Sequence, residues 1–61
     1  MRDIYGFKIR WKQGKKEHCF LSESMTETEH KSAELRAKGY RVSHAENVIF
    51  TEDRRGEHID D

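Results

Sequence analysis

The sequence predicts an α+β fold, in which a small antiparallel sheet carries one helix packed on one face. The predicted order is β-β-α-β, and a short fourth strand is left open. Three observations lead to this prediction: apolar residues alternate over residues 5–12, residues 25–39 have the start and stop signals of a helix, and residues 40–44 alternate again. The chain has 61 residues, so at most one domain is expected.

The first two strands are expected to form a hairpin. Apolar side chains occupy every second position of the first strand, at Tyr5, Phe7, Ile9 and Trp11. Gly14 and Lys15 are expected to form a two-residue loop, because glycine accepts the positive φ of a tight corner, and a second strand follows from about Glu17 to Ser22. This loop sets Lys12 opposite Glu17, Trp11 opposite His18 and Ile9 opposite Phe20. A loop one residue earlier keeps the faces but changes the partners.

Residues 25–39 are expected to form the helix. Thr26 and Glu29 have the spacing of a capping box, in which each side chain bonds the backbone N–H of the other residue. Gly39 marks the C-terminal stop. The face toward the sheet is expected to consist of Leu35 and small residues, namely Thr28, Ser32 and Ala33. The bulk of the core is then expected from the sheet, through Phe7, Trp11 and Phe20.

The sequence after the helix is less regular. Tyr40, Val42 and His44 alternate and predict a third strand, and residues 48–51 either end that strand or form a short fourth one. From Glu52 on, the residues are polar and aperiodic, which predicts a disordered tail. The expected organisation is one domain at residues 1–51 and a tail at residues 52–61.

Composition favours a cytoplasmic protein of a bacterial host cell. The net charge is zero, and 39% of the residues are charged. Cys19 is the only cysteine, so an intrachain disulfide is excluded. No apolar run approaches the roughly 18–20 residues that a membrane span needs, and residues 1–10 lack the apolar stretch of a signal peptide. No membrane association is therefore expected.

The residues that most often carry chemistry do not form a known motif. His18 and Cys19 are adjacent, which on a strand points them to opposite faces, and the other histidines are scattered. Structural zinc sites need paired ligands at short spacing, and phosphate loops need clustered glycines. A chain of this length also has little room for a large pocket. We therefore expect no enzyme activity, no metal and no cofactor.

The candidate binding site is the basic hairpin. If the aromatic side chains face the helix, Lys8, Arg10 and Lys12 stand together on the open face of the sheet. The candidate site residues are Lys8, Arg10, Lys12, Lys15, Lys16 and Leu21. Basic residues on a two-stranded ribbon suit nucleic-acid phosphates, but exposed strands also carry lysine to stay soluble and to block edge pairing. Leu21 and Cys19 are expected to add apolar surface to the same face.

Residues Lys8 to Leu35, with the sequence KIRWKQGKKEHCFLSESMTETEHKSAEL, resemble the arm-binding N-terminal domains of phage-type tyrosine integrases. The shared features are an aromatic and basic strand, a Gly-Lys turn, a second strand that ends in Phe, and a helix with an acidic start. Family members bind DNA with the sheet face, so the resemblance implies DNA-facing roles for Lys8, Arg10 and Lys12. Those domains place their third strand before the hairpin, whereas here it is expected after the helix. The order expected here is similar in topology to small phage proteins that bind and inhibit host machinery.

The function predicted from the sequence is that of a small, non-enzymatic binding module of a phage, a prophage or a bacterium, with an accessory or regulatory role. It is expected to dock its open sheet face or a sheet edge onto a protein partner. The alternative is a nucleic-acid-binding protein that uses the basic hairpin, with DNA and RNA not distinguished. The neutral net charge favours the protein partner, because dedicated DNA binders are usually basic overall. A homodimer through an open sheet edge is also left open.

Overall fold

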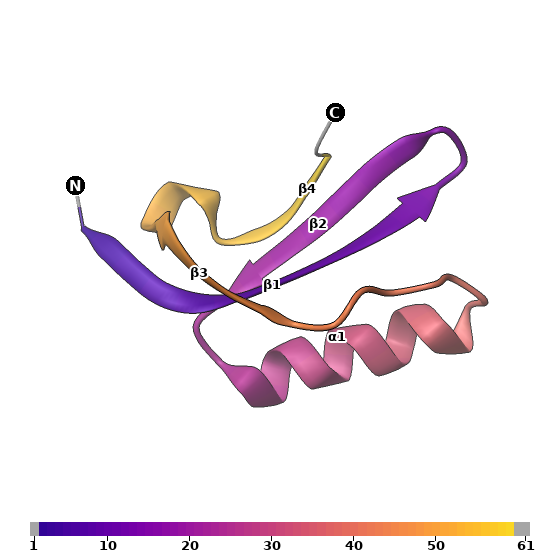
Figure 1. Cartoon of the computed structure of the whole chain (residues 1–61), viewed down its shortest axis with the longest axis horizontal. Helices are drawn as coiled ribbons and strands as arrows, with labels where there is room; N and C mark the ends of the chain where they lie inside the picture. The colour runs from indigo at the N-terminus through magenta and orange to yellow at the C-terminus, as the bar shows by residue number, and fades with distance from the viewer. Residues whose placement is uncertain (1, 60–61) are drawn as a thin grey trace.

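Residues 2–59, the part of the chain that the computed structural model describes, form a four-stranded antiparallel sheet with an α-helix on one side. The elements are β1 (Asp3–Gln13), β2 (Lys16–Ser22), α1 (Met25–Ala37), β3 (Glu46–Thr51), the 3₁₀ turn η1 (Glu52–Arg54) and β4 (Gly56–Ile59). The strand order in the sheet is β3-β1-β2-β4. Figure 1 shows α1 on one side of the strands and η1 on the other. The predicted fold class is confirmed, with a fourth strand.

The β1–β2 hairpin has the register that the two-residue loop predicts. Gly14 has a φ of 68°, which suits the first loop position of a type II′ turn. Gln13 pairs with Lys16, so Gly14 and Lys15 form the loop. The predicted cross-strand pairs are present: Lys12 with Glu17, Trp11 with His18, and Ile9 with Phe20. The alternative loop one residue earlier is therefore excluded.

The helix α1 begins earlier than its predicted cap. Ser24 is the N-cap, and its hydroxyl accepts a hydrogen bond from the backbone N–H of Glu27 at 3.2 Å. The predicted cap at Thr26 was therefore wrong. Ser24 and Glu27 have the same spacing as Thr26 and Glu29, so the capping pattern in the sequence fits either pair.

The helix ends at the glycine that the sequence predicts as its stop. Gly39 has a φ of 96°. Its N–H donates to the Arg36 carbonyl at 2.9 Å, and the N–H of Tyr40 donates to the Leu35 carbonyl at 3.1 Å. These two bonds define a Schellman motif, and its usual hydrophobic contact is present because Tyr40 packs against the core that contains Leu35. The motif turns the chain back toward β1.

Apolar side chains are buried on both faces of the sheet. On the side of α1, the core consists of Ile9, Trp11, Phe20 and Leu35. On the opposite side, a second core consists of Ile4, Leu21 and Phe50. The predicted facing of Ile9 and Trp11 toward the helix agrees with this arrangement. Tyr5 was expected beside them but is 76% exposed, because the first residues of β1 extend beyond the start of α1 (Figure 1).

Residues 40–44 run beside β1 without forming the predicted third strand. They make an isolated bridge between Val42 and Trp11. At the next position, the Ser43 N–H donates to the Arg10 carbonyl at 2.9 Å, and the Ser43 hydroxyl accepts from the Arg10 N–H at 2.9 Å. A side chain thus takes the place of a backbone carbonyl, which interrupts the ladder. Regular pairing resumes in β3, which includes the predicted short strand at residues 48–51.

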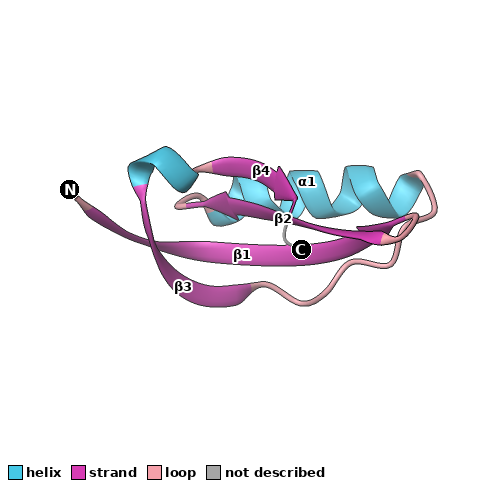
Figure 2. Ribbon diagram, turned by 90° about the horizontal axis from the view of Figure 1, so that it is seen from above, coloured by secondary structure: helices cyan, strands magenta, loops and turns pink. Residues whose placement is uncertain are grey.

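Part of the segment that was expected to be a disordered tail belongs to the sheet. The chain passes from β3 at one edge through η1 to the other edge, where β4 pairs with β2 (Figure 2). Two ion pairs hold this segment, Lys31 Nζ to Glu57 Oε1 at 3.0 Å and Arg55 Nη2 to Glu23 Oε1 at 2.8 Å. β4 is held by backbone pairing and polar contacts rather than by a buried apolar face. Its sequence therefore lacks the apolar alternation by which a strand is predicted. Residues 60–61 of the expected tail lie outside the described residues.

A glycine is required at position 6 of β1. Gly6 lies on the face opposite α1, between β2 and the ring of Phe50. A β-carbon at this position would clash with the carbonyl oxygen of Ser22 and lie 2.8 Å from Phe50 Cε1. The Phe50 ring therefore closes over β1 because residue 6 has no side chain.

We expect Gly6→Ala to destabilise the fold. The added methyl group meets backbone and an aromatic ring, and overpacking of this kind costs about 1–3 kcal/mol. Denaturant unfolding followed by the fluorescence of Trp11, the only tryptophan, measures the effect. Asp3→Ala changes an exposed residue of the same strand and should alter the free energy of unfolding by less than about 0.5 kcal/mol. Equal midpoints for G6A and the wild type would contradict this packing.

We also expect a chain that ends at Thr51 to be less stable than the full chain. Cys19 and Leu21 pair with β4 and are 2% and 6% exposed. Uncovering them should lower the free energy of unfolding by at least about 2 kcal/mol, the value for one buried apolar side chain. The Cys19 thiol should also react faster with a disulfide reagent under native conditions.

The control for this truncation is Glu57→Gln, which removes only the ion pair with Lys31, a pair whose Glu57 side chain is 46% exposed. Such pairs contribute at most about 1 kcal/mol, so this variant should unfold close to the wild type. An unchanged rate of thiol reaction in the truncated chain would show that β4 does not cover Cys19.

Candidate nucleic-acid interface

The face of the sheet opposite α1 is not the open surface that the sequence predicts. The hairpin register does place Lys8, Arg10 and Lys12 on one face together with Leu21 and Cys19. Leu21 and Cys19 are buried, however, and Leu21 belongs to the core with Ile4 and Phe50. The expectation that Leu21 contacts a partner is corrected accordingly, because its side chain packs inside the fold and β4 pairs along the edge of β2.

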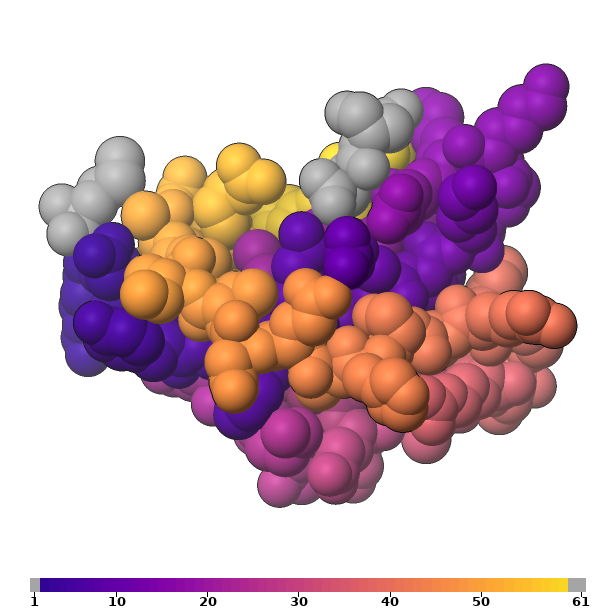
Figure 3. Space-filling model, in the orientation of Figure 1, coloured from indigo at the N-terminus to yellow at the C-terminus, as the bar shows by residue number. Residues whose placement is uncertain are grey.

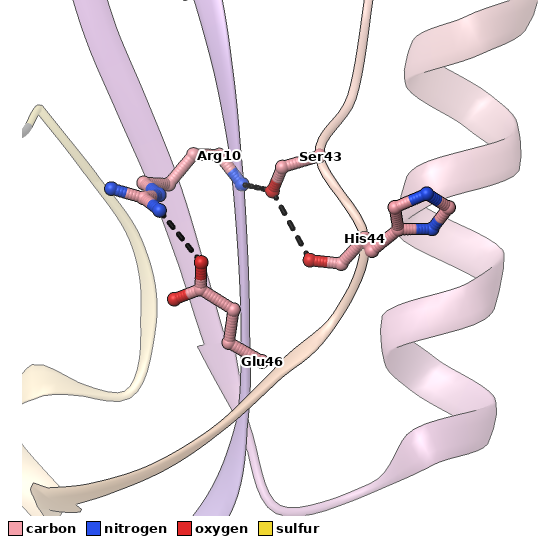
Figure 4. A network of polar contacts seen from close by, with 4 residues as sticks. All are labelled: Arg10, Ser43, His44 and Glu46. Carbon is pink, nitrogen blue, oxygen red and sulfur yellow. Dashed lines mark hydrogen bonds and ion pairs between the residues drawn. The ribbon is translucent and has the colours of Figure 1, made fainter.

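Two of the three cations on that face are partly enclosed. Lys8 and Arg10 are half-buried. Arg10 Nη2 lies 2.6 Å from Glu46 Oε1, so its charge is compensated locally (Figure 4). Lys12 is the exposed member of the three residues to which the integrase resemblance assigns DNA-facing roles.

Exposed cations gather instead at the turn of the hairpin and just after the helix. Lys12, Lys15 and Lys16 are exposed, and Arg41 is exposed in the segment that follows α1. We call these four residues the basic end. No carboxylate within residues 2–59 forms an ion pair with any of them. Figure 3 shows the turn of the hairpin projecting from the body of the molecule at the upper right.

A groove separates the hairpin from the segment that follows α1. Its volume is about 650 Å³, within the range of about 300–1,000 Å³ that is typical of small-molecule sites. This is more room than the chain length led us to expect. The apolar part of its lining comes from Trp11, Tyr40 and Val42, and the charged part from Arg10, Lys12, Arg41 and Glu17. We call it the hairpin groove.

Residues 39–43 form the wall of the hairpin groove that faces the hairpin, and hydrogen bonds to β1 hold this wall in place. Ser43 bonds both backbone groups of Arg10, as described above. Figure 4 shows the Ser43 hydroxyl between the Arg10 N–H and the carbonyl of His44, to which it donates at 3.3 Å. The Schellman motif fixes Tyr40 at the start of the same wall. The groove is therefore preformed in the folded chain.

Trp11 gives the hairpin groove a rigid floor. It is 3% exposed, and its indole stacks on the His18 ring with centroids 5.7 Å apart and an interplanar angle of 19°. In the described part of the chain, the indole N–H and His18 Nδ1 have no hydrogen-bond partner. Stacking and apolar burial, rather than hydrogen bonds, therefore hold the two rings.

Reasoning from the sequence missed the half of the groove that follows the helix. Residues 40–44 were interpreted as a strand, so Tyr40 and Arg41 were not considered together with the hairpin. The signal that could have joined them is Gly39, because a Schellman motif is accompanied by a hydrophobic contact of the residue after the glycine, here Tyr40, with the last turn of the helix. The alternation after Gly39 then sends Tyr40 and Val42 inward and Arg41 outward.

A second exposed surface lies near the other end of β1. Tyr5 pairs with Ile49 of β3, and the two side chains are 76% and 60% exposed. β3 is an edge strand of the described sheet, and it contains neither lysine nor proline. Lysine and proline are the residues that proteins commonly place on an edge strand to prevent pairing with another chain. We call this surface the β3 edge.

Comparisons with known proteins do not inform the function, because no protein-family model, no curated protein and no solved structure matches the chain. Within residues 2–59, no helix has the length and apolar character of a membrane span. The same residues contain no cluster of three or more histidine, cysteine or acidic side chains that could hold a metal ion. The basic end, the hairpin groove and the β3 edge are thus the features on which a proposal can rest.

Proposed function

We propose that the protein is a small binding module without catalytic activity, and that it binds a nucleic acid at the basic end. The observation that carries this proposal is the set of exposed cations, free of ion pairs within the described residues, on two segments that border one groove. Lysine and arginine bind a phosphate backbone strongly because they release its condensed counterions. Four such side chains at one end of a small domain suit this kind of ligand.

The placement of charge explains how a chain of zero net charge can bind a polyanion. Glu17 is the one carboxylate in the lining of the hairpin groove. Other carboxylates gather away from it, at Glu23, Glu27 and Glu29 near the start of α1 and at Glu52 and Asp53 in η1. Figure 1 shows these segments toward the end of the molecule away from the hairpin turn. The longest dimension is 35 Å, whereas charges are screened beyond about 10 Å at 0.1 M salt. The distant carboxylates therefore cancel little of the attraction at the basic end.

This proposal reverses the preference that the sequence suggested. A protein partner on the open sheet face was favoured by the neutral net charge and by the apolar patch that Leu21 and Cys19 were expected to form there. Both residues are buried, so that patch is not available to a partner. The basic end then offers the stronger chemical argument.

We expect Lys15→Gln/Lys16→Gln to weaken nucleic-acid binding without unfolding the protein, because both side chains are exposed at the hairpin turn. Fluorescence anisotropy with a labelled oligonucleotide at about 50 mM salt measures the affinity. Each phosphate contact that is lost should make the slope of log K against log salt less negative by about 0.7–0.9. Arg2→Gln/Arg54→Gln removes the same charge far from the hairpin turn and should leave affinity and slope unchanged.

Two outcomes would contradict the nucleic-acid proposal. The first is that the wild-type protein binds no nucleic acid at tens of micromolar, because electrostatic binders reach dissociation constants of about 10⁻⁴ to 10⁻⁶ M even at physiological salt. The second is an equal loss of affinity in the control variant, since this would show that binding does not take place at the basic end.

A second candidate function is the docking of another protein on the β3 edge as an added strand. The exposure of Tyr5 and Ile49 beside an unprotected edge favours it. The occupant to which we commit is a second copy of this chain. Two antiparallel β3 strands can pair around a two-fold axis, which brings the same exposed residues of both copies together and continues the sheet.

If the β3 edge pairs with a second copy, the protein should form a dimer whose population rises with concentration. Sedimentation velocity over a wide range of concentrations detects it. Ile49→Lys places a charge on the edge and should shift the protein to monomer. Ile59→Lys makes the same change at a residue 53% exposed on the other edge strand, β4, and should leave the dimer unchanged. A wild-type monomer at every concentration would rule out this mode of association.

A further inference from the structure

We infer that the hairpin groove selects single-stranded nucleic acid, with a base against Tyr40 and phosphates on the basic end. This inference rests on the proposed nucleic-acid binding and adds the kind of strand that is bound. In a duplex, the flat faces of the bases are stacked inside, and a protein meets phosphates and base edges. A single strand presents base faces and phosphates together, and proteins bind it with aromatic side chains in a positively charged groove.

The hairpin groove offers both kinds of surface side by side. Trp11, Tyr40 and Val42 form its apolar lining. Lys12 borders it from the hairpin and Arg41 from the segment after α1, so cations stand on both walls. A strand in the groove can therefore rest a base on the apolar lining while phosphates on either side of that base meet a cation.

Tyr40 is the aromatic side chain that a base can reach. Trp11 is 3% exposed and already stacks on His18, so its ring faces are not accessible. Tyr40 is half-buried, lines the groove and is held by the hydrogen bond to the Leu35 carbonyl and by its contact with the core. A ring that is already held in place loses little conformational freedom on binding, which favours affinity.

A duplex would use different residues. A two-stranded ribbon fits the major groove of DNA, which is about 12 Å wide. The hairpin turn with Lys15 and Lys16 could enter it, and Tyr40 would make no contact with stacked bases. The effect of Tyr40 therefore separates the two modes of binding.

The test compares a labelled single strand of mixed sequence with a duplex of the same length. Tyr40→Leu keeps an apolar side chain against the core but removes the aromatic face. It should weaken single-strand binding by about fivefold to a hundredfold, the usual effect of losing one stacked base, and leave duplex binding unchanged. Tyr40→Phe keeps the ring and should bind as the wild type does. Tyr5→Leu makes the same change at the exposed tyrosine near the other end of β1 and should have no effect.

The outcomes separate this inference from the proposed function. If the wild type prefers the duplex, or if Tyr40→Leu binds the single strand as well as the wild type, the single-strand inference is overturned while the nucleic-acid proposal stands. The wild-type comparison needs no variant, so it decides the matter even if Tyr40→Leu fails to fold. If neither oligonucleotide binds, the proposed function fails and the inference fails with it.

Discussion

The pairing of β1 along both of its edges is the constraint on which the rest of the structure depends. Residues 7–13 pair with β2 on one side, and residues 3–8 pair with β3 on the other. The two faces of this central strand are buried at different positions along its length. Ile9 and Trp11 pack on the side of α1, and Ile4 packs on the opposite side with Phe50. Gly6 lies between the halves, where the Phe50 ring approaches the strand most closely.

The candidate site follows from the point at which this pairing stops. β3 leaves β1 at Lys8, and residues 40–43 continue beside the strand through one bridge and the bonds of Ser43. An irregular segment of this kind leaves a groove where a further strand would have closed the sheet. Lys12 of the hairpin lines this groove, and Lys15 and Lys16 follow it at the turn. The proposed binding surface is thus a consequence of an incomplete sheet rather than of a dedicated insertion.

Local features of the fold could be predicted from the sequence, and those that depend on distant segments could not. Gly14 sets the hairpin register and Gly39 ends the helix, because a positive φ at each position is a local requirement. Leu21 is buried against Ile4 and against Phe50 of β3, and it pairs with Gly56 of β4; these partners lie far along the chain, and the periodicity of the second strand does not predict them. The lysines of the basic end could be found from the alternation that places Lys12 and from the turn that places Lys15 and Lys16. Gly39 indicates where Tyr40 follows the helix, but the hydrogen bonds of Ser43 to Arg10, which hold this segment beside β1, have no signal in the sequence.

The small size of the domain would couple the proposed binding at the hairpin groove to folding. Trp11, Tyr40 and Val42 belong both to the lining of the groove and to the core on the side of α1. A domain of about 60 residues buries only about 60% of the surface that its unfolded chain exposes, so its stability is small. A ligand that binds only the folded groove adds about 2.7 kcal/mol at a concentration 100 times its dissociation constant. That contribution is a large fraction of the roughly 5 kcal/mol at the lower end of domain stabilities. Release of residues 40–43 from β1 would open the groove and uncover Trp11 in one step, so a ligand that holds this segment in place also protects the core. The side chains that shape the groove therefore cannot vary independently of those that keep the chain folded.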